Sequence, residues 1–130
     1  MSDLACVLTA VDLLASRGLR TWVFGAWGEE LRGLVAPCAH ADVELLYPGR
    51  DLTRLDALDL EWIPARRRPY KRAFALDGVP VEVVLVERDG HGWFTEAHRW
   101  PPNVFAASGR LPVASLAALT GYRSSFRRAA

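Results

Sequence analysis

The strongest constraint on the fold is the presence of carboxylates inside two apolar runs that are typical of buried strands. Residues 81–86 read Val-Glu-Val-Val-Leu-Val, and residues 42–47 read Asp-Val-Glu-Leu-Leu-Tyr before a Pro-Gly turn. Side chains alternate along a strand, so Asp42 and Glu44 share one face while the apolar residues between them take the other. Glu82 has aliphatic neighbours on both sides. The fold must therefore give these acids a way to avoid uncompensated burial.

A cation would provide that compensation, because burying an unpaired carboxylate is costly and burying several together is costlier still. Asp42 and Glu44 on one strand, with Glu82 on a neighbouring strand, would bracket two divalent metals about 3.5–4 Å apart. Mg²⁺ prefers such oxygen ligands and keeps positions for phosphate and water. Two other interpretations stay open: the Asp-x-Glu pair lies on a solvated face, and Glu82 faces solvent from an edge strand.

The spacing of apolar residues predicts alternating helices and strands. A helix over residues 4–14 is expected to be capped by Ser2 or Asp3 and ended by Gly18. The remaining pattern predicts strands at 21–24, 42–47 and 60–63, the last at a sheet edge, and helices at 26–34, 51–58 and from 115 onwards.

The Asp77-Gly78 pair predicts a hairpin between strands at 72–76 and 81–87, followed by a turn-rich stretch at 88–92. The fold class expected from these elements is α/β (α+β), with a small, largely antiparallel or mixed sheet flanked by helices.

Length and composition favour one ordinary globular domain over residues 1–130, with 51% hydrophobic and 24% charged residues. A net charge of +1 gives no reason to expect a nucleic-acid partner, and no apolar run is long enough to predict a membrane span. The two cysteines, Cys6 and Cys38, lack metal spacing and make no disulfide framework. We expect a cytoplasmic protein with reduced thiols and without a nucleic-acid or membrane partner.

One stretch of the sequence resembles a known signature. Phe-Gly-Ala-Trp at 24–27, a helix, and His-Ala-Asp-Val-Glu-Leu at 40–45 resemble the nucleotidyltransferase superfamily, in which a glycine turn, a helix and an acidic strand follow one another. The form is similar to the aminoglycoside and lincosamide adenylyltransferases, which carry Gly-Gly-Trp, a helix of the same length, a His-Asp-Asp-Ile-Asp-Leu type strand and a Pro-Gly turn. The match has no gap from residue 25 to 49, and weaker likeness extends over most of the chain.

The resemblance implies a nucleotidyltransferase fold and a role for each matched residue. Backbone N–H groups of Gly25 and Ala26 would approach the phosphates of ATP or another nucleoside triphosphate at a helix start. Asp42 and Glu44 would ligate magnesium. Glu82 would complete the metal site and act as general base on a hydroxyl of a small-molecule acceptor, such as an aminoglycoside-like or lincosamide-like compound.

Departures from the family pattern concern both the turn and the tail. Ala26 replaces the second glycine or serine of the turn, and Glu44 and Glu82 are each longer than the usual aspartate by one methylene. The family usually has a phosphate-binding lysine near its last Gly-Tyr, where this chain has Leu119-Thr120. Two interpretations stay open for Arg123, Arg127 and Arg128: one of them replaces the lysine as a phosphate contact, or they form a solvated basic tail.

Two functions follow from this pattern. The first is an enzyme that transfers a nucleotide, AMP in the first instance, in a magnesium-dependent reaction. The alternative is a repurposed nucleotidyltransferase-fold protein that binds or transforms a small apolar or natural-product-like ligand without nucleotide chemistry. A helical partner chain could supply the phosphate contacts that this chain lacks, and a homodimer is the alternative assembly.

Other residues leave alternatives open. His40 either lies near the site or is an ordinary loop histidine, and Arg66-Arg67-Arg68 either meets phosphates or is solvated. Trp93 and Trp100, in loop-like sequence, either line an acceptor pocket or pack internally. Core packing beneath the glycine turn is expected for Trp22 and Trp27.

Overall fold

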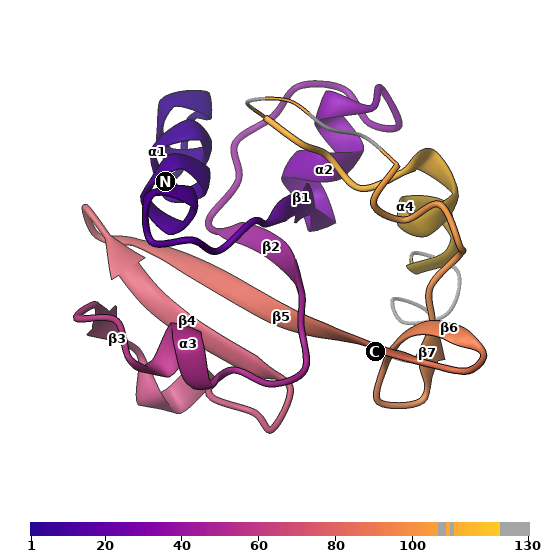
Figure 1. The fold of residues 1–130 in the computed structure, drawn as a ribbon. Coiled ribbons are helices and arrows are strands. Elements are labelled where there is room, and N and C mark those ends of the chain that lie inside the picture. The colour runs from indigo at the N-terminus through magenta and orange to yellow at the C-terminus, as the bar shows by residue number, and fades with distance from the viewer. Residues whose placement is uncertain (107–108, 110, 123–130) are drawn as a thin grey trace.

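The computed structural model describes residues 1–106, 109 and 111–122, arranged around one mixed sheet (Figure 1). The central strand order is β1 (Trp22–Phe24), β2 (Val43–Pro48), β5 (Val79–Asp89), β4 (Lys71–Leu76) and β3 (Glu61–Trp62). The pair β2–β5 is parallel, and the other neighbours in this order are antiparallel. The expected mixed sheet is confirmed.

The hairpin between β4 and β5 forms where the sequence predicts it. Asp77 and Gly78 both have positive φ, 50° and 79°, as a two-residue turn of this hand requires. The turn sets Leu76 opposite Val79 and, three pairs further along, Ala73 opposite Glu82. This register decides which face of the sheet Glu82 occupies.

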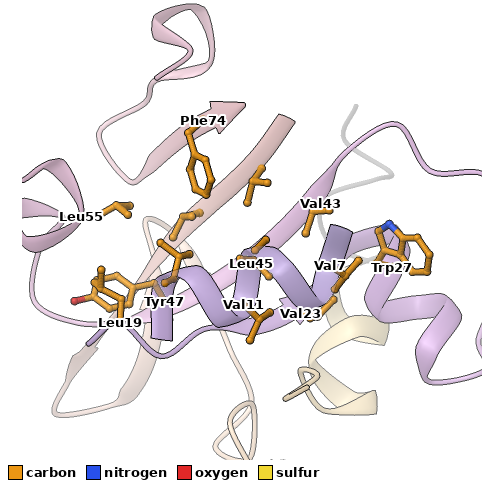
Figure 2. Packing of buried hydrophobic residues seen from close by; sticks show 14 of the residues in the cluster. Val7, Val11, Leu19, Val23, Trp27, Val43, Leu45, Tyr47, Leu55 and Phe74 are labelled. Carbon is orange, nitrogen blue, oxygen red and sulfur yellow. The ribbon is translucent and has the colours of Figure 1, made fainter. Parts of the chain in front are cut away.

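One face of the sheet is covered by α1 (Leu4–Ser16) and α3 (Thr53–Asp56). Helix α1 begins at Asp3, whose side chain accepts a hydrogen bond from the Cys6 amide at 2.8 Å, and it ends before Gly18, which has φ of +81°. Figure 2 shows its side chains packed over the first strands of the sheet. The fully or almost fully buried members of this core include Val7, Val11, Leu14, Val23, Val43, Leu45, Leu55, Phe74, Val81 and Val83.

The opposite face holds a second apolar cluster under α4 (Leu116–Tyr122) and the segment around Trp100. Its buried members are Phe24, Leu46, Val84, Val86, Trp100, Val104, Ala114, Ala118 and Leu119. Glu44 and Glu82 are an even number of residues from Leu46 and Val84, so they lie on this second face.

The remaining elements are shorter than the sequence pattern predicts. Helix α2 (Gly25–Leu31) stops before Gly33, whose φ of +75° lets the Leu34 amide bond back to Glu29. The helix expected at 51–58 is reduced to α3, the edge strand at 60–63 to β3, and a single 3₁₀ turn, η1 (Pro64–Arg66), follows.

The prediction of loop structure around Trp93 is wrong. β5 runs on to Asp89, and the chain returns as β6 (Gly92–Thr95) and β7 (His98–Arg99), which form a small extension at the far end of β5 (Figure 1). Gly92, with φ of +110°, makes the tight reversal possible. Among the residues described, no helix is both long and apolar enough to cross a membrane.

Candidate active site

The acids singled out in the sequence converge at the start of the parallel strand pair. Glu44 and Glu82 are register partners on β2 and β5, and Asp42 directly precedes β2. One carboxylate oxygen from each of the three lies within 4.8 Å of those of the other two. All three residues are partly buried. Because β5 lies between β2 and β4, the alternative of Glu82 on an edge strand is wrong.

The glycine turn lies directly against this acid cluster (Asp42, Glu44 and Glu82). Phe24, the last residue of β1, pairs with Glu44, and Gly25 then opens α2 with φ of +66°. A Cβ on Gly25 would lie 2.7 Å from Cδ of Glu44. The backbone conformation favours glycine here, and any larger residue would also have to displace the Glu44 carboxylate.

Two cations of the chain already meet the acid cluster. Lys71 Nζ donates to Glu82 Oε1 at 2.8 Å. Arg66 Nη1 lies 3.3 Å from Asp42 Oδ2 and 4.0 Å from Glu82 Oε2. The side chains are partly exposed, from 12% for Glu82 to 39% for Arg66, so the pairs are screened and each adds little stability.

For Arg66 the interpretation as part of a solvated basic run is wrong, because its side chain lies 3.3 Å from Asp42. Arg67 and Arg68 are exposed, as that interpretation expects. Arg68 instead donates to backbone carbonyls, and Arg67 lies 3.9 Å from Asp56. Lys71, the lone lysine of the sequence, was missed. The register of the predicted hairpin would have indicated the role of Lys71, because it pairs residue 73 with Glu82 and so puts residues 71, 73 and 82 on one face of the sheet.

A pocket of about 140 Å³ opens beside the acid cluster. It is lined by Phe24, Glu44, Tyr70, Lys71, Glu82, Val84, Thr95, Trp100 and Tyr122. The aromatic members form one wall: Trp100 stacks on Tyr122 with 6.2 Å between ring centroids, and Phe24 meets Tyr122 edge-on at 5.3 Å. Trp100 thus both lines the pocket and packs internally, at 6% exposure.

Trp93 lines a different cavity, of about 370 Å³, at the opposite ends of β2 and β5. Its lining does not include the expected phosphate-binding and metal-binding residues Gly25, Ala26, Asp42, Glu44 and Glu82. His98 packs edge-on against Trp100 at 4.5 Å, and burial lowers the pKa of its imidazole. His98 is thereby held toward its neutral form in the wall behind the pocket.

The donor set of the acid cluster fits magnesium. Carboxylate oxygens are the ligands that Mg²⁺ prefers, and three of them converge without burying any one completely. Arg66 and Lys71 would have to release Asp42 and Glu82 for the ion to bind. Both side chains are long enough to turn away while their backbones stay in place.

Other sequence expectations have mixed outcomes. Trp22 and Trp27 are buried, as expected. His40 lies on the loop between α2 and β2, but it is buried, and its ring packs against Trp27. Thr120, where the family has its lysine, is exposed and bonds to Leu116 O within its own helix. The substitute phosphate contacts considered at Arg123, Arg127 and Arg128 lie outside the described residues.

Comparison with known proteins supports the fold. No protein-family model matches the sequence. None of the curated proteins matches it either. Among solved structures, the chain is similar to the crystal structure of ANT(2'')-Ia in complex with adenylyl-2''-tobramycin, with a TM-score of 0.61 and 16% identity over 97% of this chain and 78% of that one.

A solution structure of the antibiotic-resistance factor ANT(2'')-Ia gives a TM-score of 0.57 at 15% identity, covering 89% of this chain and 61% of that one. Identity at this level shows the fold and leaves the reaction open. The chain therefore has the nucleotidyltransferase fold.

Proposed function

We propose that this protein transfers a nucleotide, AMP from ATP in the first instance, to a hydroxyl of a small-molecule acceptor. The observation that carries the proposal is the convergence of Asp42, Glu44 and Glu82 beside the Gly25 turn. The likeness to an enzyme solved with an adenylylated aminoglycoside supports the same reaction class. Adenylyl transfer to an aminoglycoside-like acceptor is the specific form proposed.

In this mechanism the chain mainly positions the reactants. Gly25 and Ala26 direct backbone N–H groups toward the phosphates at the start of α2. Glu82 accepts the proton of the acceptor hydroxyl while the hydroxyl oxygen bonds to the α-phosphorus and pyrophosphate leaves. Lys71, released from Glu82, turns to the phosphates and supplies the positive charge that Thr120 lacks.

Asp42, Glu44 and Glu82 would hold magnesium, which neutralises charge on the phosphates and polarises the phosphoryl group when it is bound. The aromatic wall of Phe24, Trp100 and Tyr122 offers an apolar surface for the nucleobase or for the sugar rings of the acceptor. At about 140 Å³ the pocket is smaller than the 300 Å³ or so typical of ligand sites. Binding therefore includes an opening movement of Lys71 and its neighbours.

The second candidate is a repurposed binding protein, and one observation favours it. Arg66 and Lys71 already balance two of the carboxylates, so the acid cluster has a stable arrangement without metal. A protein that had lost nucleotide chemistry would retain the aromatic pocket and keep these ion pairs closed. The two candidates differ in whether magnesium and a nucleotide bind together.

A thermal-shift titration with each nucleoside triphosphate, with and without magnesium, separates them. At a ligand concentration one hundred times the Kd, binding stabilises the fold by about 2.7 kcal/mol. For a 130-residue chain this raises Tm by about 10 °C. The expected result is such a shift with ATP only when magnesium is present, and its loss in Asp42→Asn.

The matched control is Asp59→Asn, which makes the same change at an exposed acid outside the cluster and should keep the full shift. Product analysis with an aminoglycoside as acceptor then tests transfer itself. Adenylylation by Asp42→Asn at the parental rate would refute the role of the acid cluster. No shift with any triphosphate, together with a shift by an acceptor-like compound alone, would establish the binding protein instead.

A further inference from the structure

A second group of metal-ligating side chains lies where the connection between α2 and β2 folds back on itself. Glu30 is near the end of α2, and Cys38 and His40 are on the following loop. One ligand atom from each residue lies within 4.8 Å of those of the other two. Spacing along the chain does not predict this site, because the fold of the loop brings the three residues together.

The distances in this group approach those around a tetrahedral ion. Nε2 of His40 is 3.0 Å from Oε1 of Glu30 and 4.0 Å from Sγ of Cys38. With zinc bonds of about 2.0 Å to nitrogen and oxygen and about 2.3 Å to sulfur, the corresponding edges of a tetrahedron are about 3.3 and 3.5 Å. These two edges therefore need to change by about half an ångström or less. The third edge, between Glu30 and Cys38, is within 4.8 Å and would have to shorten toward about 3.5 Å by rotation of the exposed Cys38 side chain.

The His40 ring is held in place before any ion binds. Its side chain is only 5% exposed and meets the Trp27 ring edge-on, with centroids 4.6 Å apart. Ser2 fixes the backbone on the same side: its Oγ donates to His40 O at 2.7 Å and accepts from Trp27 Nε1 at 2.7 Å. Such supporting contacts orient a ligating histidine and strengthen its binding.

We propose that Glu30, Cys38 and His40 form a binding site for a divalent transition-metal ion of the zinc type. Thiolate, imidazole and carboxylate together favour zinc over magnesium or calcium, which prefer oxygen ligands. Cys38 is exposed, so the ion enters from solvent and its fourth position is open to water or to an external ligand. The ion replaces the present hydrogen bond between His40 and Glu30.

Binding at this site would stabilise the segment that carries the start of the acid cluster. His40 is two residues before Asp42, and Ser2 Oγ lies within 3.4 Å of the carbonyl oxygens of both. The ion would join the end of α2 to the loop that delivers Asp42 to β2. The site is independent of nucleotide chemistry and does not rest on the proposed function.

Cobalt titration of the reduced protein tests the site, because Co²⁺ substitutes for zinc and a cobalt–thiolate bond gives a charge-transfer band in the near ultraviolet. The expected result is a band that saturates with one equivalent of Co²⁺ and is removed by zinc. Cys38→Ser should abolish it, and Glu30→Gln should weaken cobalt binding by about tenfold or more. Zinc should raise the Tm of the parent and not that of Cys38→Ser.

The matched control is Cys6→Ser, which removes the other thiol, on α1, and should keep the band and the zinc-induced shift. Asp42→Asn should also keep the band, which separates this site from the acid cluster. Metal-free Tm values show that each variant is folded. Absence of the band in the parent, or its loss in Cys6→Ser and retention in Cys38→Ser, would overturn the proposal.

Discussion

Replacement of Gly25 by alanine tests the closeness of the glycine turn to the acid cluster. An alanine at φ of +66° is in the left-handed region, which costs about 1–2 kcal/mol. Its Cβ would also lie 2.7 Å from Cδ and 3.2 Å from Cβ of Glu44, so the Glu44 side chain must leave its rotamer. That displacement adds about 0.5–1.5 kcal/mol. The total loss in the free energy of unfolding is about 1.5–3.5 kcal/mol.

Gly78→Ala provides the control, because Gly78 has a similar φ of +79° and a Cβ there would have nothing within 4 Å. It should lose only the conformational part, about 1–2 kcal/mol. For 130 residues, unfolding entropy near the midpoint corresponds to a Tm change of about 4 °C per kcal/mol. We therefore expect Tm to fall by about 6–14 °C in Gly25→Ala and by about 4–8 °C in Gly78→Ala.

A double-mutant cycle isolates the contact with the carboxylate. Glu44→Ala removes the atoms closest to the new Cβ, so combining it with Gly25→Ala should recover most of the excess loss over Gly78→Ala. Urea denaturation, with m-values compared across the variants, gives the free energies. Equal losses in Gly25→Ala and Gly78→Ala, or no recovery in the double mutant, would refute the crowding argument.

Two further predictions concern charged pairs. Lys71→Met should strengthen the binding of magnesium alone, because Glu82 loses its ammonium partner, and should weaken the binding of magnesium together with ATP. Calorimetric titrations with magnesium alone and with magnesium and ATP measure the two affinities. Weaker binding of magnesium alone would contradict the reasoning. The hydrogen bonds from the Arg99 guanidinium and the His91 amide hold the pKa of the Asp89 carboxyl well below its usual value of 3.8. The stabilising effect of the ionised Asp89 is therefore present above pH 3.8, and it is lost as the pH falls through the lower pKa of the folded state. Asp89→Asn should therefore lower Tm at neutral pH, with the difference from the parent shrinking in strong acid; a difference independent of pH would exclude this linkage.

The sheet and the acid cluster could be predicted because local signals determined them. Asp77-Gly78 set the hairpin register, and alternation along 42–47 placed the acids opposite the apolar core. Parallel pairing of β2 with β5 then brought Glu44 level with Glu82. The resemblance to nucleotidyltransferases supplied the expectation that these strands are neighbours.

The features that were missed depend on how loops fold in space. β6 is a four-residue strand that exists because β5 extends far enough to pair with it, and no local pattern shows that extension. Arg66 contacts Asp42 because the 3₁₀ turn η1 places residue 66 beside the acid cluster. Glu30, Cys38 and His40 meet only because the loop after α2 returns to its own helix. The spacing of residues along the sequence does not predict these contacts between loops and distant elements.

The salt links from Arg66 and Lys71 have a practical consequence for handling the protein. Because the cluster carries internal countercharge, the polypeptide has no electrostatic need for added ions while it folds. In Cys38→Ser, which lacks a ligand of the proposed second metal site, purification in chelating buffers should therefore leave circular dichroism and the melting curve unchanged. Raising the ionic strength, which screens partly exposed pairs, should weaken these links.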